Sequence, residues 1–373
     1  MANPSSTSSS DIPSLPGGFP WALAGAMLIL LAVEIAIRLA PPEQFIPYDG
    51  GLGEHLAIAS FLSAIGPADV AFVGSSMTRD GIAPPLVRAQ LEPAVGRPVY
   101  VANYSASSLV IDETNAIVNY MIRQKATPRL LLCEICPQQL RPSTSFRMGT
   151  TAIFWDIEDL IRNLVQNGKA STRALPMFIR RQAGQGWLTL RYRERLRQWS
   201  QQLLRLTDKP MVPMLGDYPE NWDARTTTSL ADPARRDSLV QRWLQRNLRG
   251  GRYPKIDPKL VVRLEQTLQL CRQHQIPLVL YEMPLSPALR AKMPPDVYKE
   301  FYALVGELAG VYAVPFYRVA DLDLSIGDEH FSDVVHMNRR GATLLTHALT
   351  QKAILPRLAP QTRADLSTSN SSH

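Results

Sequence analysis

The chain has 373 residues, of which 45% are hydrophobic and 20% charged, so its composition is that of an ordinary globular protein of one large or two smaller domains. No zinc-finger, RNA-recognition or basic-region pattern is present, and nucleic acid is therefore not an expected partner. The formal net charge of +7 leaves two interpretations, an ordinary basic surface or attraction to an anionic partner such as lipid headgroups or an acidic polymer.

The N-terminal region contains a polar tail and then an apolar stretch. Residues 1–19 are rich in Ser, Pro and Gly, which predicts disorder. Residues 20–40 are mostly apolar and about as long as a helix that crosses a bilayer. Near the end of this stretch, Glu34 and Arg38 are four residues apart and can pair on one helix face, and Pro41-Pro42 then ends the helix. We expect a single membrane anchor.

Two other interpretations of the apolar stretch remain open. A cleavable signal peptide lacks the basic residues before the stretch and the small-residue cleavage site after it. An amphipathic surface helix would need a polar face, which the first part of the stretch does not have. The flanking charges do not determine the orientation. The expected location is the inner (cytoplasmic) membrane, single-pass, with the main domain in the periplasm, and a cytosol-facing enzyme is the alternative.

Residues 53–357 form the main domain, in which strand and helix patterns alternate. This alternation predicts an α/β fold with a parallel sheet that is covered by helices on both faces. The expected strands are 69–73, 98–103, 129–135, 277–281 and a short one within 311–316. The expected helices are 55–65, one that begins near Pro85, 114–124, 258–273, 295–309 and 338–354. Residues 358–373 form a second polar tail, also expected to be disordered.

Residues 141–255 interrupt this alternation with a basic segment that is rich in Arg, Gln and Trp and has a helical pattern over 187–206. Six arginines cluster in it: Arg180, Arg181, Arg191, Arg193, Arg195 and Arg197. The simpler interpretation is a solvated helical insertion. The alternative is a basic cap that contacts membrane headgroups or an anionic substrate.

The chain has three cysteines, Cys133, Cys136 and Cys271. The first two have the spacing of a redox or metal pair, but 130–136 has the pattern of a buried strand, on which they would point to opposite faces. No second Cys/His pair with ligand spacing follows them. We expect cysteines of the core, and neither a metal nor a nucleotide cofactor.

Two short segments contain the residue types of a serine-hydrolase triad. The segment Gly74-Ser75-Ser76 follows the first strand, at the end where α/β proteins bind ligands, and Gly74 lets the chain turn sharply there. Asp333 and His336 precede the last helix. An imidazole can take the proton of a serine hydroxyl, and a carboxylate can orient that imidazole. Nearby His330 is a competing candidate for the base.

These segments resemble the SGNH, or GDSL-type, hydrolase family. That family has its nucleophile in a Gly-Asp-Ser block after the first strand, and an Asp-x-x-His pair before its last helix. The similarity to the first block implies Ser76 as the nucleophile. The segment 331–342 is similar to the closing block, which implies Asp333 and His336 as the other triad residues. The Gly-Ser-Ser variant, the anchor and the segment 283–287 are similar to the membrane-anchored subgroup that includes the D-alanyl-transfer protein DltD and the alginate O-acetylation proteins.

The resemblance covers residues 66–140 and 258–352. It implies a flavodoxin-like three-layer α/β/α sandwich and an esterase or O-acyltransferase. The implied substrates are acyl esters of an extracytoplasmic polysaccharide or cell-envelope glycan, with a membrane-embedded acyl-donor protein as a further partner. The closest candidates for the family's oxyanion donors are Ser108, at the position of its glycine, and Gln138, in place of its asparagine. The alternative is an inactive scaffold or glycan-binding subunit of a polysaccharide synthesis or secretion complex.

Overall fold

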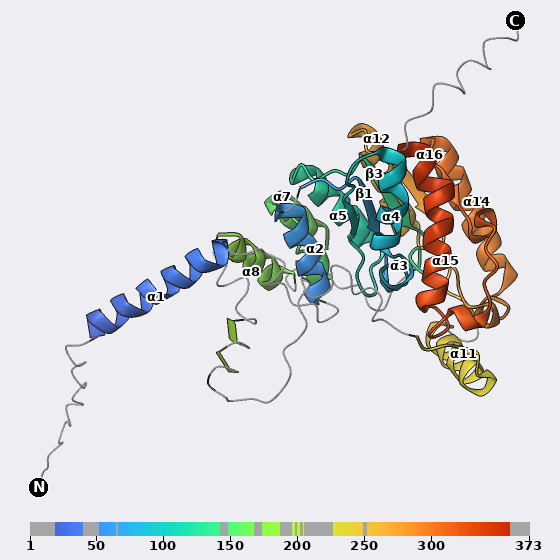
Figure 1. Ribbon diagram of the computed structural model, residues 1–373, viewed down its shortest axis with the longest axis horizontal. Helices are drawn as coiled ribbons and strands as arrows, with labels where there is room; N and C mark the ends of the chain where they lie inside the picture. Colours follow the sequence, from blue (N-terminus) through green and yellow to red (C-terminus); the bar gives the residue numbers. More distant parts are fainter. Residues whose placement is uncertain are drawn as a thin grey trace, which may run out of the picture.

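The computed structural model describes residues 19–39, 52–64, 66–141, 148–167, 174–186, 196–197, 200–201, 204, 227–248 and 252–358. The tails were expected at residues 1–19 and 358–373, and all of their residues except Phe19 and Leu358, which are helical, lie outside the described residues. Most of the segment 187–226 lies outside them as well. Figure 1 shows helix α1 (Phe19–Leu39) projecting from a body in which strands and helices alternate along the chain.

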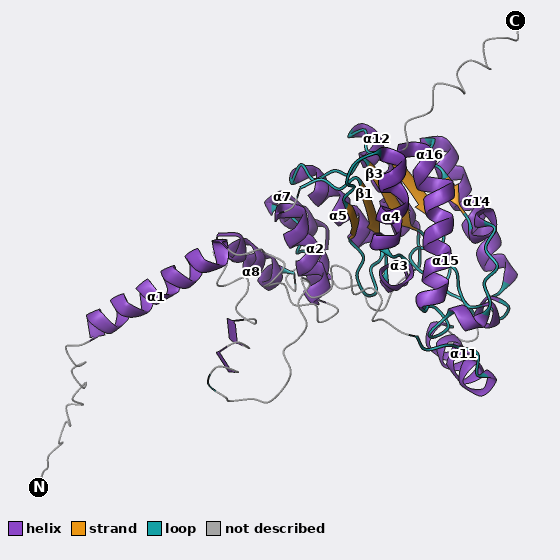
Figure 2. Ribbon diagram, in the orientation of Figure 1, coloured by secondary structure: helices purple, strands orange, loops and turns teal. Residues whose placement is uncertain are grey.

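Five parallel strands form one sheet in the order β2-β1-β3-β4-β5. Figure 2 shows the strands, in orange, among the helices of the body. Their bounds are β1 Val70–Val73, β2 Val101–Asn103, β3 Leu130–Glu134, β4 Leu278–Tyr281 and β5 Phe316–Tyr317. All residues of β1, β3 and β4 are buried, and their sequences are almost continuously apolar. Such strands are typical of a parallel sheet with helices on both faces. The predicted α/β class and parallel sheet are confirmed.

Helices contact one another in two groups. Helix α4 (Pro84–Val95) contacts α15 (Arg339–Leu349), whereas α12 (Pro258–Gln273) contacts both α5 (Ile111–Arg123) and α14 (Pro295–Tyr312). The chain moves in one direction across the sheet from β1 to β2, and in the opposite direction in all later crossovers. Because such crossovers are right-handed, the two groups belong on opposite faces of the sheet.

Two strands differ most from their predicted bounds. The second was expected at 98–103, but the amides of Val99 and Tyr100 donate to the side chains of Glu92 and Asp69 instead of to a neighbouring strand. The last was expected within 311–316, but helix α14 continues to Tyr312 and the strand begins at Phe316. Side-chain acceptors therefore determine where β2 begins, and the extra turn of α14 determines where β5 begins.

Side-chain caps explain where two predicted helices begin. The carboxylate of Asp257 accepts the hydrogen bond of the Lys259 amide at the start of α12. Pro258, the first residue of the helix, has no backbone N–H that would need a partner. The side chain of Asn338 accepts the amides of Arg340 and Gly341 at the start of α15. The last helix was expected to end at residue 354. Instead, α15 continues through a π-helical turn (Thr350–Ile354) into α16 (Leu355–Leu358).

The remaining elements are a helix before the first strand, short helices and turns, and the helices of the segment 141–255. They are α2 Leu52–Ala64, α3 Ser76–Gly81, α6 Met148–Thr151, α7 Ile157–Asn167, α8 Leu175–Gly186, α11 Pro233–Asn247, α13 Pro287–Arg290, and the 3-10 turns η5 Val319–Leu322 and η6 Asp328–His330.

One of the six clustered arginines contradicts the expectation of a solvated basic face. Arg181 is buried, its Nη1 donates to the carbonyl oxygen of Trp155 at 3.0 Å, and its guanidinium lies 4.5 Å from the ring centroid of Tyr120. This arginine therefore joins the segment to the core. Arg197 is described, whereas the side chains of the other four arginines lie outside the described residues.

Helix α1 occupies the stretch that was expected to be the anchor. Its ion pair between Arg38 and Glu34, at 2.7 Å, forms as expected, and apolar side chains such as Trp21 and Leu28 are exposed. Among the described residues, no helix combines the length and the apolarity needed to cross a bilayer. The membrane anchor stays a prediction.

The three cysteines are buried and free. The reasoning for Cys136 was wrong in one respect, because β3 ends at Glu134 and Cys136 lies beyond the strand. Burial raises the pKa values of the Cys133 and Cys136 thiols, which keeps both thiols protonated and poorly reactive. Within the described part of the chain, no cluster of three possible metal-ligating side chains occurs.

Candidate active site

The two predicted segments meet at the carboxyl edge of the sheet. Ser76 begins α3 directly after β1, and the loop before α15 carries Asp333 and His336. Ser76 Oγ lies 2.8 Å from His336 Nε2, although the two residues are 260 positions apart. His336 Nδ1 lies 2.8 Å from Asp333 Oδ2. A hydroxyl, an imidazole and a carboxylate thus form one continuous hydrogen-bonded chain.

Backbone hydrogen bonds hold the carboxylate of this chain in place. Asp333 Oδ1 accepts the amides of Val335 and His336, each at 2.8 Å, which leaves Oδ2 for the imidazole. The loop is closed by Ser332, whose amide and hydroxyl both donate to the carbonyl oxygen of His336. Helix α15 packs against α3, so that this loop faces Ser76. The local Asp-x-x-His spacing therefore orients the acid, and tertiary packing brings in the serine.

The charges around His336 favour its protonated form. Burial by itself lowers the pKa of the imidazole, but the hydrogen bond and charge of Asp333, together with the charge of Asp80, outweigh burial and the opposing charge of Arg79. The pKa of His336 is therefore raised. For Asp333, burial raises the pKa, but the contacts with His336 and the two amides outweigh it and lower the pKa. This is the electrostatic arrangement of a base whose charged form is stabilised by its carboxylate.

The competing candidate His330 is used elsewhere. Its Nδ1 accepts the amide of Gly327 at 2.9 Å and lies 3.3 Å from Glu329. The imidazole in contact with Ser76 is that of His336.

A buried carboxylate beneath the nucleophile was not anticipated from the sequence. Glu134, the last residue of β3, accepts from the amide of Ser75 at 2.7 Å, from the hydroxyl of Ser75 at 2.8 Å and from the hydroxyl of Thr78 at 2.6 Å. Tyr281 lies 2.7 Å from the hydroxyl of Thr78 and extends this network. Burial raises the pKa of Glu134, and the donors from Thr78 and Ser75 act against that rise. Ser75 thus binds Glu134, and only Ser76 faces the imidazole.

A sequence signal for this network existed. A glutamate at the end of an otherwise apolar, fully buried strand requires hydrogen-bond donors, because an unpaired buried charge is strongly unfavourable. The hydroxyl-rich turn after the first strand is the nearest source of such donors at the same edge of the sheet.

Gly74 is needed here for close packing. Its φ is not among the positive ones, so the expected sharp turn does not depend on a left-handed backbone. A Cβ at this position would lie 2.5 Å from Glu134 Oε2 and 2.7 Å from Glu134 Cβ, and it would also overlap Thr78 Oγ1. Both side chains are buried and have little room to move.

Gly74→Ala is therefore expected to lower the free energy of unfolding by about 1–3 kcal/mol, the usual effect of overpacking a core. Urea unfolding would measure it. Gly306→Ala is the matched control, because a Cβ there on α14 meets nothing within 4 Å and alanine favours the helix. Equal stability of the Gly74→Ala variant and the unchanged protein would show that the contact with Glu134 is unimportant.

Both candidate oxyanion donors lie at the same cavity as the triad. This cavity, of about 310 Å³, is lined by Ser76, His336, Ser108 and Gln138, among others. Ser108 has φ 59°, a left-handed conformation that favours glycine, so the loop keeps a glycine-like geometry with serine in place. Glu54 on α2 accepts the neighbouring Ser107 amide at 2.6 Å.

The side-chain amide of Gln138 is available for a ligand. Both Gln138 Nε2 and Gln138 Oε1 are buried without a hydrogen-bond partner in the described structure. A buried amide without partners is unfavourable and needs an explanation, and a bound ligand would supply one.

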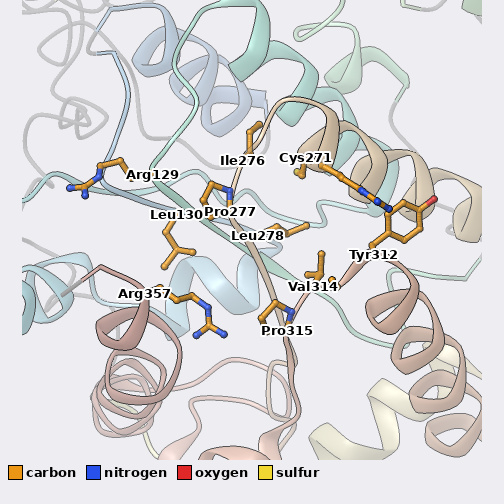
Figure 3. Close-up of a pocket in the computed structure, with 12 residues that line it drawn as sticks. Arg129, Leu130, Cys271, Ile276, Pro277, Leu278, Tyr312, Val314, Pro315 and Arg357 are labelled. Carbon is orange, nitrogen blue, oxygen red and sulfur yellow. The ribbon is translucent and has the colours of Figure 1, made fainter. Parts of the chain in front are cut away.

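A larger cavity, of about 440 Å³, lies at the opposite edge of the sheet, between the amino ends of β3 and β4 (Figure 3). Its lining includes Arg129, Arg357 and Cys271 but no Ser, His, Asp or Glu. Burial raises the pKa of the Cys271 thiol to about 12, so that this thiol is not a nucleophile at neutral pH. The arrangement of a base beside a nucleophile occurs only at the smaller of these two cavities.

The geometry of the smaller cavity is therefore the main basis for a function. No family model matches the chain, and no curated protein matches it. The resemblance of the two segments to SGNH hydrolases stays a prediction.

Proposed function

We propose that this protein is a membrane-anchored serine esterase or O-acyltransferase of the SGNH type, with Ser76 as nucleophile, His336 as general base and Asp333 as the residue that orients the base. The observation that carries the proposal is the chain of two 2.8 Å contacts from Ser76 through His336 to Asp333. Distances of this kind meet the geometric requirement for proton transfer from a hydroxyl to a base.

In the first half of the reaction, Ser76 Oγ attacks the ester carbonyl carbon while His336 Nε2 takes the hydroxyl proton. The tetrahedral intermediate collapses as His336 returns that proton to the departing alcohol, which leaves the acyl group on Ser76. In the second half, water or a sugar hydroxyl attacks the acyl-enzyme with His336 again as base. Water makes the protein an esterase, whereas a sugar hydroxyl makes it an acyltransferase.

The developing negative charge on the carbonyl oxygen needs donors. The amides of Ser76 and Ser108 and the side-chain amide of Gln138 are the candidates. The left-handed backbone of Ser108 and the unpartnered amide of Gln138 support this assignment. Loss of one such donor typically lowers turnover about 10²- to 10³-fold.

The same proposal includes the fold family and the location. A flavodoxin-like three-layer sandwich is supported by the strand order 2-1-3-4-5, which is the order of that fold. An anchor in the inner membrane is supported by the exposed apolar side chains of α1. An acylated glycan or envelope polymer as substrate, a membrane-embedded acyl donor as partner and a periplasmic domain follow from the resemblance alone.

A fluorophosphonate probe tests the mechanism on the full-length protein in detergent. The probe should attach to Ser76, as peptide mass spectrometry would show, because its reaction needs the same deprotonation by His336. Only neutral His336 can accept the proton. Since the pKa of His336 is raised, the labelling rate should increase with pH through an inflection above about 6.5, the ordinary value for histidine. An inflection below that value would contradict the electrostatic role of Asp333.

A protein that is not labelled under conditions that label a known esterase would not have this mechanism. If it still bound an acylated polymer, the alternative of a scaffold or glycan-binding subunit would be favoured.

A further inference from the structure

The cavity at the triad contains cationic side chains without balancing carboxylates. Its lining includes Arg141 and Arg246, and none of its described lining residues is Asp or Glu. A cavity lined by charges of one sign raises the local concentration of ligands of the opposite sign. The composition of the cavity therefore indicates an anionic ligand.

Arg141 is the strongest feature of this cavity. Its side chain is buried, its Nε donates to the carbonyl oxygen of Pro137 at 3.0 Å, and its Nη1 donates to that of Pro254. Its Nη2 is buried and has no hydrogen-bond partner in the described structure. The negative charges of Glu300 and Asp296 raise the pKa of Arg141, although neither carboxylate forms an ion pair with it. Burial outweighs these charges and lowers the pKa.

An arginine held in this way is prepared for a ligand. Two of its nitrogens are held by backbone carbonyls, so that the guanidinium loses little freedom when a third group binds. The remaining donor lacks a partner, and an anion would remove that deficit, since bonds from arginine to carboxylate or phosphate are among the strongest in proteins.

Helix α11 contributes another wall of the cavity. Trp243, Arg246 and Asn247 line the cavity from positions three and four apart, which is one face of a helix. The ring of Trp243 is stacked on that of Tyr253 with an interplanar angle of 17°. Aromatic rings beside polar donors give a sugar both an apolar surface and hydrogen bonds.

This wall is attached to the loop that carries Asp333 and His336. The amide of Leu230 donates to the carbonyl oxygen of Phe331 at 2.8 Å, and Arg235 Nη2 donates to that of Ser332 at 3.0 Å. A group bound between α11 and Arg141 therefore has a defined position relative to His336.

We propose that Arg141 and Arg246 form an anion-binding subsite, so that the substrate is a glycan with a carboxylate or phosphate close to the acylated hydroxyl. The inference deepens the proposed function, because it takes the triad cavity as the place where the acylated glycan binds. Arg141 holds the anion from the floor of the cavity and Arg246 from the rim. The guanidinium of Arg141 lies 3.8 Å from the ring centroid of Tyr253, so that Tyr253 supports the arginine and Trp243 flanks the sugar ring.

Binding is measured first, without any need for catalysis. Titration calorimetry on the full-length protein would compare a tetragalacturonate, its methyl-esterified form and a neutral tetraglucoside. The uronate should bind about 10- to 100-fold more tightly than the two neutral forms, which is the usual effect of one charged hydrogen bond. Competition by inorganic phosphate and by free galacturonate would then show which anion the subsite prefers, and displacement by either supports the subsite.

Three variants test whether Arg246 and Arg141 cause the preference for the uronate. Arg246→Gln changes an exposed side chain and should fold normally, and it should lower the preference for the uronate about tenfold or more. Arg141→Lys keeps the charge but not the planar fork, and it should also reduce the preference. Arg242→Gln, on the same helix but outside the cavity lining, is the matched control and should change nothing.

Equal affinity for the charged and neutral glycans in the unchanged protein would overturn the subsite. So would an Arg246→Gln variant with its preference intact. Probe labelling of Ser76 together with no preference for anions would refute this inference alone. Preferential binding of the uronate without any labelling would refute the proposed esterase and leave the subsite standing.

Discussion

Replacement of Ser76 by alanine is expected to lower kcat/KM for ester hydrolysis by about 10⁴- to 10⁶-fold, because removal of a nucleophilic serine leaves only substrate binding and the oxyanion donors. Release of the alcohol from a small acyl ester such as p-nitrophenyl acetate measures this loss directly. The fold should be unaffected, since the side chain of Ser76 is half-buried and its hydroxyl contacts His336 rather than the core.

Ser75→Ala is the matched control for that experiment. The hydroxyl of Ser75 accepts the amide of Met77 and donates to Glu134, so that its loss should reduce stability by about 1 kcal/mol as the loss of a helix cap does. Most of the activity should remain, because Ser76 and its base are still present. Full activity in Ser76→Ala would refute the mechanism, and loss of activity only in Ser75→Ala would make Ser75 the nucleophile.

Replacement of Asp333 by asparagine should lower kcat/KM by about 10³- to 10⁴-fold. The asparagine keeps an oxygen for the amides of Val335 and His336, so the loop should still form. What is lost is the negative charge of the Asp333 carboxylate beside His336 Nδ1. That charge selects the correct tautomer of His336 and stabilises the imidazolium that forms during attack. The residual activity would come from the nucleophile and the oxyanion donors.

The pH profile of the same variant gives an independent test. Burial alone lowers the pKa of His336, and the hydrogen bond and charge of Asp333 are the main reason that it is raised. In Asp333→Asn the acid limb of kcat/KM, followed from about pH 5 to about pH 8, should therefore move to lower pH while the plateau falls. His330→Asn is the control, because the imidazole of His330 accepts the amide of Gly327 and lies beside Glu329, whereas that of His336 contacts Ser76. A profile that does not move would mean that Asp333 has no electrostatic role.

Much of the fold could be predicted because its signals are local. The apolar runs of β1, β3 and β4 are buried on both faces, so each can be identified from its own residues. Prolines and capping side chains mark the start of α12 and α15 in the same way. The predictions failed where a distant side chain decides the outcome, as when Asp69 takes the Tyr100 amide and shortens β2.

The candidate site also contains residues that the sequence could identify and residues that it could not. Asp333 and His336 are three residues apart, and the bonds that orient them lie within one loop, so the pair could be identified from the sequence. The choice of Ser76 over Ser75 depended on a resemblance, whereas the structure gives it a physical reason, namely that Ser75 binds Glu134. Glu134 itself was missed, although its burial at the end of β3 explains both the role of Ser75 and the need for Gly74.

By itself, the sequence determined the order of strands and helices in the α/β domain, the three residue types of the triad, and the Asp-x-x-His pair. These depend on periodicity and short spacing, which the chain shows directly. Only the tertiary structure decided that Ser76 reaches His336 across 260 residues, that Arg181 enters the core, and that Arg141 lies in the triad cavity with a donor that has no partner among the described residues. Those outcomes depend on which distant segments share a sheet edge and on which buried polar atoms find partners, and neither is contained in any local pattern of residues.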